Sequence, residues 1–251
     1  MPKDDSSSLP YLSIIVTTLN SSNVIRELLN SIESQTSLDF NLIIVDGGSI
    51  DDTVKIINSY NCVTNLEISN GIGIYEGLNL AVSMCKTKYY IVCGSDDILF
   101  PNAVEIINKS ILSSADLYIF SVFMGGNLVE GNSPTLLRRI FGWQSIISSH
   151  SVGTVIKTDL HNNLGYYDSK VKILADGLFL TKVLYNNNFS KVISKEIVGK
   201  FGVDGASNKN YYNNIFTTFV IQSSFYNYYI QLILLIFRLI KYKNFLKLNN
   251  D

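Results

Sequence analysis

Cysteine, histidine, proline and charged residues are all scarce in this chain of 251 residues. Its three cysteines, Cys62, Cys85 and Cys93, are too few and too scattered for a disulfide scaffold or a zinc site. Charged residues make up 16% of the chain and the net charge is −1, so no basic block is available to bind nucleic acid. Because 47% of the residues are hydrophobic, we expect a folded domain with a sizeable core rather than disorder.

The first ten residues lack the apolar stretch of a signal peptide. They hold Lys3, Asp4, Asp5 and three serines instead. We therefore expect a flexible N-terminus over residues 1–10, a cytoplasmic, reducing setting, and a domain that starts near residue 11.

Short β-branched runs alternate with stretches of helical spacing along the first hundred residues. The pattern predicts strands at 11–19, 40–45, 66–69 and 89–93. Helices are predicted between them, at 24–35, from residue 53, and at 75–85. Strands and helices that alternate in this way predict an α/β fold with a mostly parallel central sheet flanked by helices.

Acidic residues come directly after two of these predicted strands. Asp46 follows the strand at 40–45, and Asp96 and Asp97 follow the strand at 89–93. Ligands bind beyond the carboxyl ends of parallel strands, so we expect the three carboxylates to meet at one edge of the sheet. One of them could hold Mg²⁺ or Mn²⁺ together with substrate phosphate oxygens, while its neighbour binds a ribose. An Asp-Asp pair is also typical of a turn or a helix cap, and by itself the pair does not decide between the two.

Four motifs occur in order over this region: Thr17-Thr18-Leu19-Asn20, Asp46-Gly47-Gly48-Ser49 through Thr53, Gly73-Ile74-Tyr75 with Asn79, and Gly94-Ser95-Asp96-Asp97. Through them, residues 10–210 resemble the family 2 glycosyltransferases of the GT-A (Rossmann-like) fold. The likeness is greatest to the bacterial enzymes that build O-antigen, capsule, lipopolysaccharide or exopolysaccharide repeat units.

The resemblance implies a GT-A domain over 11–210 that transfers a sugar from a nucleotide sugar, a UDP-sugar in particular, with Mn²⁺ or Mg²⁺ as cofactor. It implies that Asp97 is the metal ligand and that nucleotide contacts come from Thr17, Thr18, Asn20, Asp46, Gly47, Gly73, Tyr75, Asn79, Ser95 and Asp96. For Tyr75 and Asn79, core packing and a polar helix face remain equal alternatives.

Further along, Leu174-Ala175-Asp176-Gly177 resembles the family segment that supplies the general base in inverting members. The resemblance implies that Asp176 takes the proton of the acceptor hydroxyl. The alternative is that Asp176 caps a helix over 177–185.

Two more residues are candidates for contacts with the diphosphate or the acceptor. His150 precedes a predicted strand, and Ser207 ends a stretch, 201–207, that resembles a family loop near the phosphates. A polar strand start and a simple turn are their respective alternatives. His161, within Asp159-Leu160-His161-Asn162-Asn163, is expected to be a solvated loop residue.

Three positions depart from the family pattern: Gly71, Glu76 and Asp204. They motivate an alternative of a different class, a non-catalytic GT-A-like module that binds nucleotide or glycan in an assembly complex.

The C-terminal segment, 211–251, is predicted to be a helical extension rich in aromatic and basic residues. Its uninterrupted apolar stretch is about half of the ~20 residues that span a bilayer. Two interpretations stand equally: an interfacial helix on the inner face of the plasma membrane, or a helix that packs on the domain or in a homodimer. The family's usual role implies a saccharide acceptor carried on a lipid such as undecaprenyl diphosphate.

Overall fold

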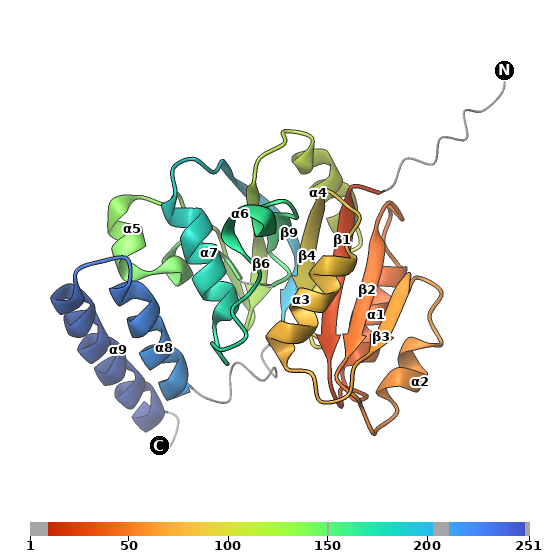
Figure 1. Cartoon of the computed structure of the whole chain (residues 1–251), viewed down its shortest axis with the longest axis horizontal. Helices are drawn as coiled ribbons and strands as arrows, with labels where there is room; N and C mark the ends of the chain where they lie inside the picture. The colour runs from red at the N-terminus through yellow and green to blue at the C-terminus, as the bar shows by residue number, and fades with distance from the viewer. Residues whose placement is uncertain (1–9, 150, 203–210, 249–251) are drawn as a thin grey trace.

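The computed structural model describes residues 10–149, 151–202 and 211–248, and within them nine strands form one mixed sheet (Figure 1). Along its main path the strand order is β3-β2-β1-β4-β8-β6-β9-β5, with β7 paired to β6. The expected α/β fold is confirmed.

Parallel pairing dominates the first half of the sheet. It joins β1 (Leu12–Thr18) to β2 (Asn41–Asp46) and β4 (Tyr89–Cys93), and β2 to β3 (Asn65–Ile68). The register places Thr18 opposite Asp46 and Val16 opposite Cys93. The carboxyl ends of β1, β2 and β4 therefore lie at the same edge of the sheet.

The second half of the sheet is mixed. β8 (Thr154–Lys157) runs antiparallel to β4 and to β6 (Leu117–Met124), whereas β9 (Lys191–Phe201) is parallel to β6. Two short strands complete it: β5 (Ile98–Leu99) pairs with β9, and β7 (Asn127–Val129) pairs with β6, both antiparallel. The parallel pairing expected from the alternation is thus confined to the strands β1, β2, β3 and β4 and to the pair of β6 with β9. The strands β5, β7 and β8 pair antiparallel to their neighbours.

Two layers of helices cover the sheet. α1 (Ile25–Glu33), α2 (Thr53–Ile57) and α4 (Ala103–Ile111) bury their apolar residues in one core. α3 (Ile74–Met84), α6 (Leu160–Leu164) and α7 (Ala175–Tyr185) pack in a second core against the other face. In α1 the side chains of Ile25, Leu28, Leu29 and Ile32 are completely buried, because their helical spacing places them on one stripe.

A helical hairpin follows at the edge of the molecule. α8 (Tyr211–Ser223) and α9 (Tyr228–Leu248) lie side by side, next to α5 (Leu136–Phe141) and the 3-10 turn Trp143–Ser145 (Figure 1). Tyr212 contacts Tyr242 and Phe219 contacts Tyr228, so the two helices are antiparallel. Across the ranges that the structure covers, no helix combines enough length and apolarity to cross a membrane.

His161 is buried in α6, so the prediction that it is a solvated loop residue is wrong. Its Nε2 atom lies 2.7 Å from the hydroxyl oxygen of Tyr90, and its ring stacks on Phe179 with centroids 4.5 Å apart. Burial lowers the pKa of His161 below its usual value. The partners that bury it, Tyr90 and Phe179, lie 71 residues earlier and 18 residues later, and the polar neighbours of His161 along the chain do not indicate them.

The lowered pKa predicts a pH-dependent cost for replacing this histidine. His161→Gln should lower the free energy of unfolding by about 1–3 kcal/mol at pH 7.5, because a buried hydrogen-bonded ring is lost. Below pH 6.5 the unfolded chain takes up a proton that the folded protein resists, so the neutral ring's contribution to stability falls as the pH falls. Urea unfolding at pH 7.5 and pH 5 measures both costs, and the cost at pH 5 should be the smaller. An equal cost at the two pH values would contradict the buried, neutral histidine.

Candidate active site

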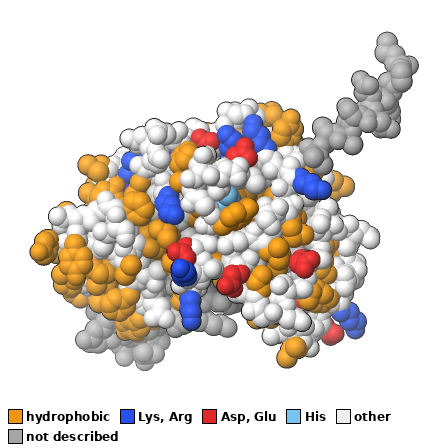
Figure 2. Space-filling view, in the orientation of Figure 1, with side chains coloured by type: hydrophobic (Ala, Val, Ile, Leu, Met, Phe, Trp, Pro, Cys, Tyr) orange, Lys and Arg blue, Asp and Glu red, His pale blue; other side chains and the backbone are white. Residues whose placement is uncertain are grey.

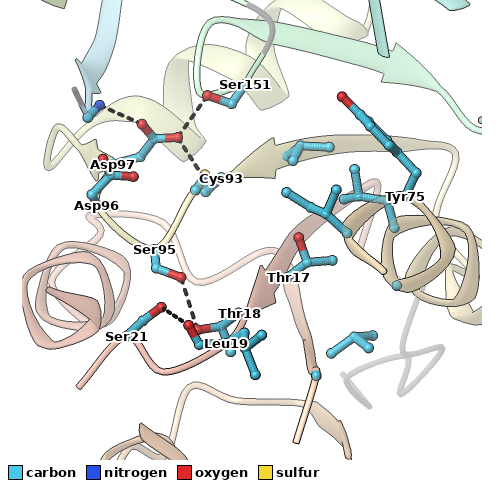
Figure 3. A pocket seen from close by; sticks show the side chains of 18 of the residues that line it. Thr17, Thr18, Leu19, Ser21, Tyr75, Cys93, Ser95, Asp96, Asp97 and Ser151 are labelled. Carbon is cyan, nitrogen blue, oxygen red and sulfur yellow. Dashed lines mark hydrogen bonds between the residues drawn. The ribbon is translucent and has the colours of Figure 1, made fainter. Parts of the chain in front are cut away.

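A cavity of about 560 Å³ opens at the carboxyl ends of β1 and β4 (Figure 3). The first turns of α3 and α7 and the end of β9 form the rest of its wall. Ten of the predicted site residues line it: Thr17, Thr18, Asn20, Gly47, Gly73, Tyr75, Ser95, Asp96, Asp97 and Asp176. The cavity therefore joins residues from both halves of the chain.

The loops after β1, β2 and β4 are hydrogen-bonded to one another. Ser95 Oγ donates to Thr18 Oγ1 at 3.0 Å, which joins the β4 loop to the end of β1. Asn20 adopts a left-handed backbone conformation with φ 49°, which asparagine tolerates better than most residues. Its backbone N–H donates to Ser49 Oγ, and its Oδ1 accepts from the N–H of Ile50, so it fixes the β1 loop against the β2 loop.

Asp46 is at the expected strand end, but its side chain is completely buried and is not among the residues that line the cavity. Its Oδ1 accepts from the backbone N–H groups of Gly48 and Ser49, and its Oδ2 accepts from Ser49 Oγ at 2.5 Å. Gly48, with φ 93°, supplies the backbone conformation that this turn needs. The carboxylate thus holds the turn that presents Gly47 to the cavity, and its contact with a nucleotide stays a prediction.

Asp97 is also buried, at 1% exposure, and both of its oxygens already accept hydrogen bonds from the protein. Oδ1 accepts from the N–H of Gly202 at 2.7 Å, and Oδ2 accepts from the N–H of Gly94 at 2.7 Å and from Ser151 Oγ at 2.8 Å. Burial raises the pKa of Asp97 to about 6, although the two N–H groups act in the opposite direction. Asp97 therefore fastens the β4 loop to the end of β9 and to the segment before β8.

Asp96 presents a more accessible carboxylate. It is half-buried in the cavity wall, where it packs against Gly202. A Cβ atom on Gly202 would lie 2.2 Å from Asp96 Cγ, so only glycine fits beside it. Within the described residues no group of three or more His, Cys, Asp or Glu side chains is placed to hold a metal. One carboxylate in the wall still fits Mg²⁺ or Mn²⁺ bound mainly through substrate phosphate oxygens, and the geometry favours Asp96 over Asp97 for that contact.

Asp176 lies in the first turn of α7, and the residue is 8% exposed. The residue before the helix, Leu174, has φ 66°, a conformation that a branched side chain seldom adopts. Tyr75 O–H donates to Asp176 Oδ1 at 2.8 Å. Burial and the nearby Asp176 raise the pKa of Tyr75 far above its usual value, so the phenol stays protonated and acts as a donor. Because Leu174 occupies the N-cap, the alternative that Asp176 caps the helix is wrong.

Tyr75 and Asn79, one turn apart on α3, differ in what they contact. Tyr75 lines the cavity, and Figure 3 shows it on the side opposite Asp96. Asn79 instead holds the backbone of Tyr167, donating from Nδ2 to its carbonyl at 2.8 Å and accepting from its N–H at 2.9 Å. Asn79 is not among the residues lining the cavity, so for this residue the alternative to a nucleotide contact, a polar helix face with a structural role, fits better.

Among the residues of the site that were not singled out from the sequence, Ser151 and Gly202 are distant partners of Asp97. Both were within motifs already noted, next to His150 and at the start of the 201–207 stretch. His150, Ser207 and Asp204 themselves lie outside the described residues. Glu76, one of the departures from the family pattern, accepts from the N–H of Gly73 at 2.7 Å and so caps its own helix.

The cavity lies at the carboxyl ends of parallel strands, with an Asp-Asp pair on one side and a carboxylate on a facing helix, which is where α/β proteins of this class bind their ligands. The chain belongs to glycosyl transferase family 2, whose family model matches residues 13–167.

Similarity to individual proteins agrees with this family. An uncharacterised glycosyltransferase of Rickettsia prowazekii is 33% identical over 132 residues, which cover 51% of this chain and 40% of that protein. The crystal structure of residues 1–349 of Staphylococcus aureus TarS in complex with UDP-GlcNAc has a TM-score of 0.66 at 20% identity, covering 91% of this chain and 71% of that one. A mannosyltransferase from Pyrobaculum calidifontis, in complex with GDP-Man and Mn²⁺, has a TM-score of 0.59 at 16% identity, covering 86% and 64%. The two structures show the same fold, and the chain spans two fifths of the Rickettsia relative.

Proposed function

We propose that this protein transfers a glycosyl group from a nucleotide sugar, most simply a UDP-sugar, to a hydroxyl of a saccharide, with inversion at the anomeric carbon. The observation that carries the proposal is that Asp96 and Asp176 line the same cavity of a family 2 fold. The proposal extends to the whole of residues 11–210 as the transferase domain.

In this proposal the nucleotide lies against the strand-end loops. Thr18, Asn20 and Gly47 face the cavity from two neighbouring loops, and their hydroxyl, amide and backbone groups suit a base and a ribose. The diphosphate would then extend toward Asp96. Mn²⁺ or Mg²⁺ bound there would supply positive charge to the departing nucleoside diphosphate. The mannosyltransferase of the same fold, in complex with GDP-Man and Mn²⁺, supports this choice of metal.

Asp176 is proposed as the general base. Its carboxylate would take the proton from the acceptor hydroxyl as that oxygen attacks the anomeric carbon and the nucleoside diphosphate leaves. Tyr75 donates to one carboxylate oxygen, which fixes the orientation of the group without removing its charge. The cavity holds the two reactants together, which accounts for part of the rate.

The acceptor is proposed to be a saccharide on a lipid diphosphate such as undecaprenyl diphosphate, in the synthesis of a bacterial surface polysaccharide at the inner face of the plasma membrane. The name of a relative, the poly(ribitol-phosphate) beta-N-acetylglucosaminyltransferase TarS, supports transfer of a sugar to a phosphate-containing acceptor. The rival, a non-catalytic module, was motivated partly by Glu76, and its capping bond to Gly73 gives that departure a local explanation.

A donor screen tests the proposal. UDP-, GDP- and dTDP-sugars are added at about one hundred times their Kd with Mn²⁺, and the melting temperature is recorded. A ligand that binds only the folded state at this excess adds about 2.7 kcal/mol, so a matching UDP-sugar should raise Tm by roughly 5–10 °C in a chain of this size. Release of UDP in the presence of a lipid-linked saccharide then tests transfer. Binding without any transfer would favour the non-catalytic module, and no stabilisation by any of the sugars would contradict both.

A further inference from the structure

Helix α9 is apolar on both sides: one side packs on the domain, and the other exposes hydrophobic side chains. The residues it turns toward the domain include Gln231, which is completely buried, Leu235, which is buried, and Arg238, which is half-buried. The stripe it turns outward is apolar throughout and is called here the outer α9 face: Tyr229, Ile233, Ile236, Phe237 and Ile240. These five side chains are between 52% and 73% exposed. Apolar residues at positions i, i+4, i+7, i+8 and i+11 form one continuous stripe, which on most helices would face the core.

Specific polar contacts hold the helix in this orientation. Gln231 Nε2 donates to the carbonyl of Ile140 at 2.9 Å, and one guanidinium nitrogen of Arg238 donates to the carbonyl of Phe141 at 2.7 Å. Both acceptors are at the end of α5. Turning the outer α9 face inward would leave these buried groups without partners, so the orientation is fixed by the fold.

The apolar surface continues beyond α9. The same α5 that accepts these bonds exposes Leu136, Leu137 and Phe141, each at least half-exposed. α8 adds Tyr212, Phe216 and Val220, which are spaced four residues apart. Figure 2 shows the hydrophobic side chains gathered over this end of the molecule. An exposed apolar patch of this extent marks a surface that binds something.

The charge of the segment points to the nature of the partner. Residues 205–250 contain four lysines and one arginine, and no aspartate or glutamate. Lys241, at the edge of the outer α9 face, is exposed. An anionic bilayer offers both an apolar layer for the stripe and negative headgroups for the lysines.

We infer that the outer α9 face and the adjoining exposed residues of α5 dock the protein on an anionic lipid bilayer, with the helix axis along the surface. A second copy of the chain fits this face less well, because pairing it with itself would bring two helical hairpins of like, positive charge together. Headgroups of anionic lipid would offset that charge instead. The inference stands on this surface and does not depend on the transfer reaction.

Vesicle flotation of the full chain tests the inference without any sugar donor. One set of vesicles contains phosphatidylcholine alone, and the other contains equal amounts of phosphatidylcholine and phosphatidylglycerol. The wild-type protein should float with the anionic vesicles, and raising NaCl from about 0.05 to about 0.5 M should release a large part of it. The double variant Ile233→Gln/Phe237→Gln should reduce the bound fraction at least about tenfold, because two anchoring side chains are lost while glutamine preserves the helix.

A matched control makes the same chemical change elsewhere. Leu38 and Leu112 are as exposed as the outer α9 face and lie outside the hairpin and α5, so Leu38→Gln/Leu112→Gln should float like the wild type. Circular dichroism and Tm check that both double variants fold. Absence of flotation by the wild type would overturn the inference, as would equal loss in the two double variants. A wild-type dimer in sedimentation velocity that Ile233→Gln/Phe237→Gln dissolves, with no flotation, would assign the face to self-association instead.

Discussion

Replacing Asp176 with asparagine should lower kcat for sugar transfer by about 10²–10⁴, because general-base catalysis contributes a factor of this size. Asparagine has nearly the same shape, and its amide oxygen still accepts the hydrogen bond from Tyr75. It does not take up the acceptor proton. The donor-induced rise in Tm with UDP-sugar and Mn²⁺ should remain as in the wild type, since the residues proposed to bind the nucleotide are on the strand-end loops and Asp176 is on α7.

Tyr75→Phe tests the same carboxylate with a smaller expected effect on kcat. The ring keeps its packing against Tyr167, but the carboxylate loses the donor that orients it. We expect a loss of about tenfold in kcat, smaller than that of Asp176→Asn, since a positioning hydrogen bond is worth about 1–1.5 kcal/mol. If Asp176→Asn retained half of the wild-type rate, Asp176 would not be the base, whatever Tyr75→Phe did.

The placement of the site at one edge of the sheet could be predicted from the sequence because it depends on local patterns. Buried strands that end in Thr18, Asp46 and Cys93, with a helix after each, leave few arrangements other than parallel pairing. The observed register, Thr18 opposite Asp46, is what that topology requires. The same reasoning placed Asp96 at the cavity, because it follows directly on a strand end, whereas Tyr75 was expected there only from the family resemblance.

The direction of individual carboxylates could not be predicted in the same way. The partners of Asp97 that bury it are 54 and 105 residues away, in Ser151 and Gly202, and only the folding of β8 and β9 onto β4 brings them close. Asp46 is different, because its partners, Gly48 and Ser49, are only two and three residues away. Asp followed by Gly and Ser is typical of a turn in which the side chain accepts from the backbone, and the observed Asp46 contacts are of this kind.

Asp96 and Asp97 should respond to replacement in opposite ways. Asp96→Ala is expected to remove the Mn²⁺-dependent part of the stabilisation by UDP-sugar and to lower kcat/KM by about 10²–10³, because charge stabilisation by a bound metal is worth several kcal/mol. The free energy of unfolding without ligand should change by less than about 1 kcal/mol, because the side chain is half-buried in a cavity wall.

Asp97→Ala should act on the folded protein itself. Two backbone N–H groups and the Ser151 hydroxyl would lose a buried acceptor, and each unsatisfied buried group costs about 1–3 kcal/mol. Tm should therefore fall by roughly 5–15 °C without any ligand. Asp52→Ala, which removes an exposed carboxylate, serves as the control and should change neither quantity. A ligand-free Tm that Asp97→Ala leaves unchanged, together with a lost Mn²⁺ response in that variant alone, would return the metal contact to Asp97. A ligand-free Tm that only Asp97→Ala lowers, together with a Mn²⁺ response that Asp96→Ala removes, would mean that Asp97 holds the pocket together while Asp96 faces the substrate.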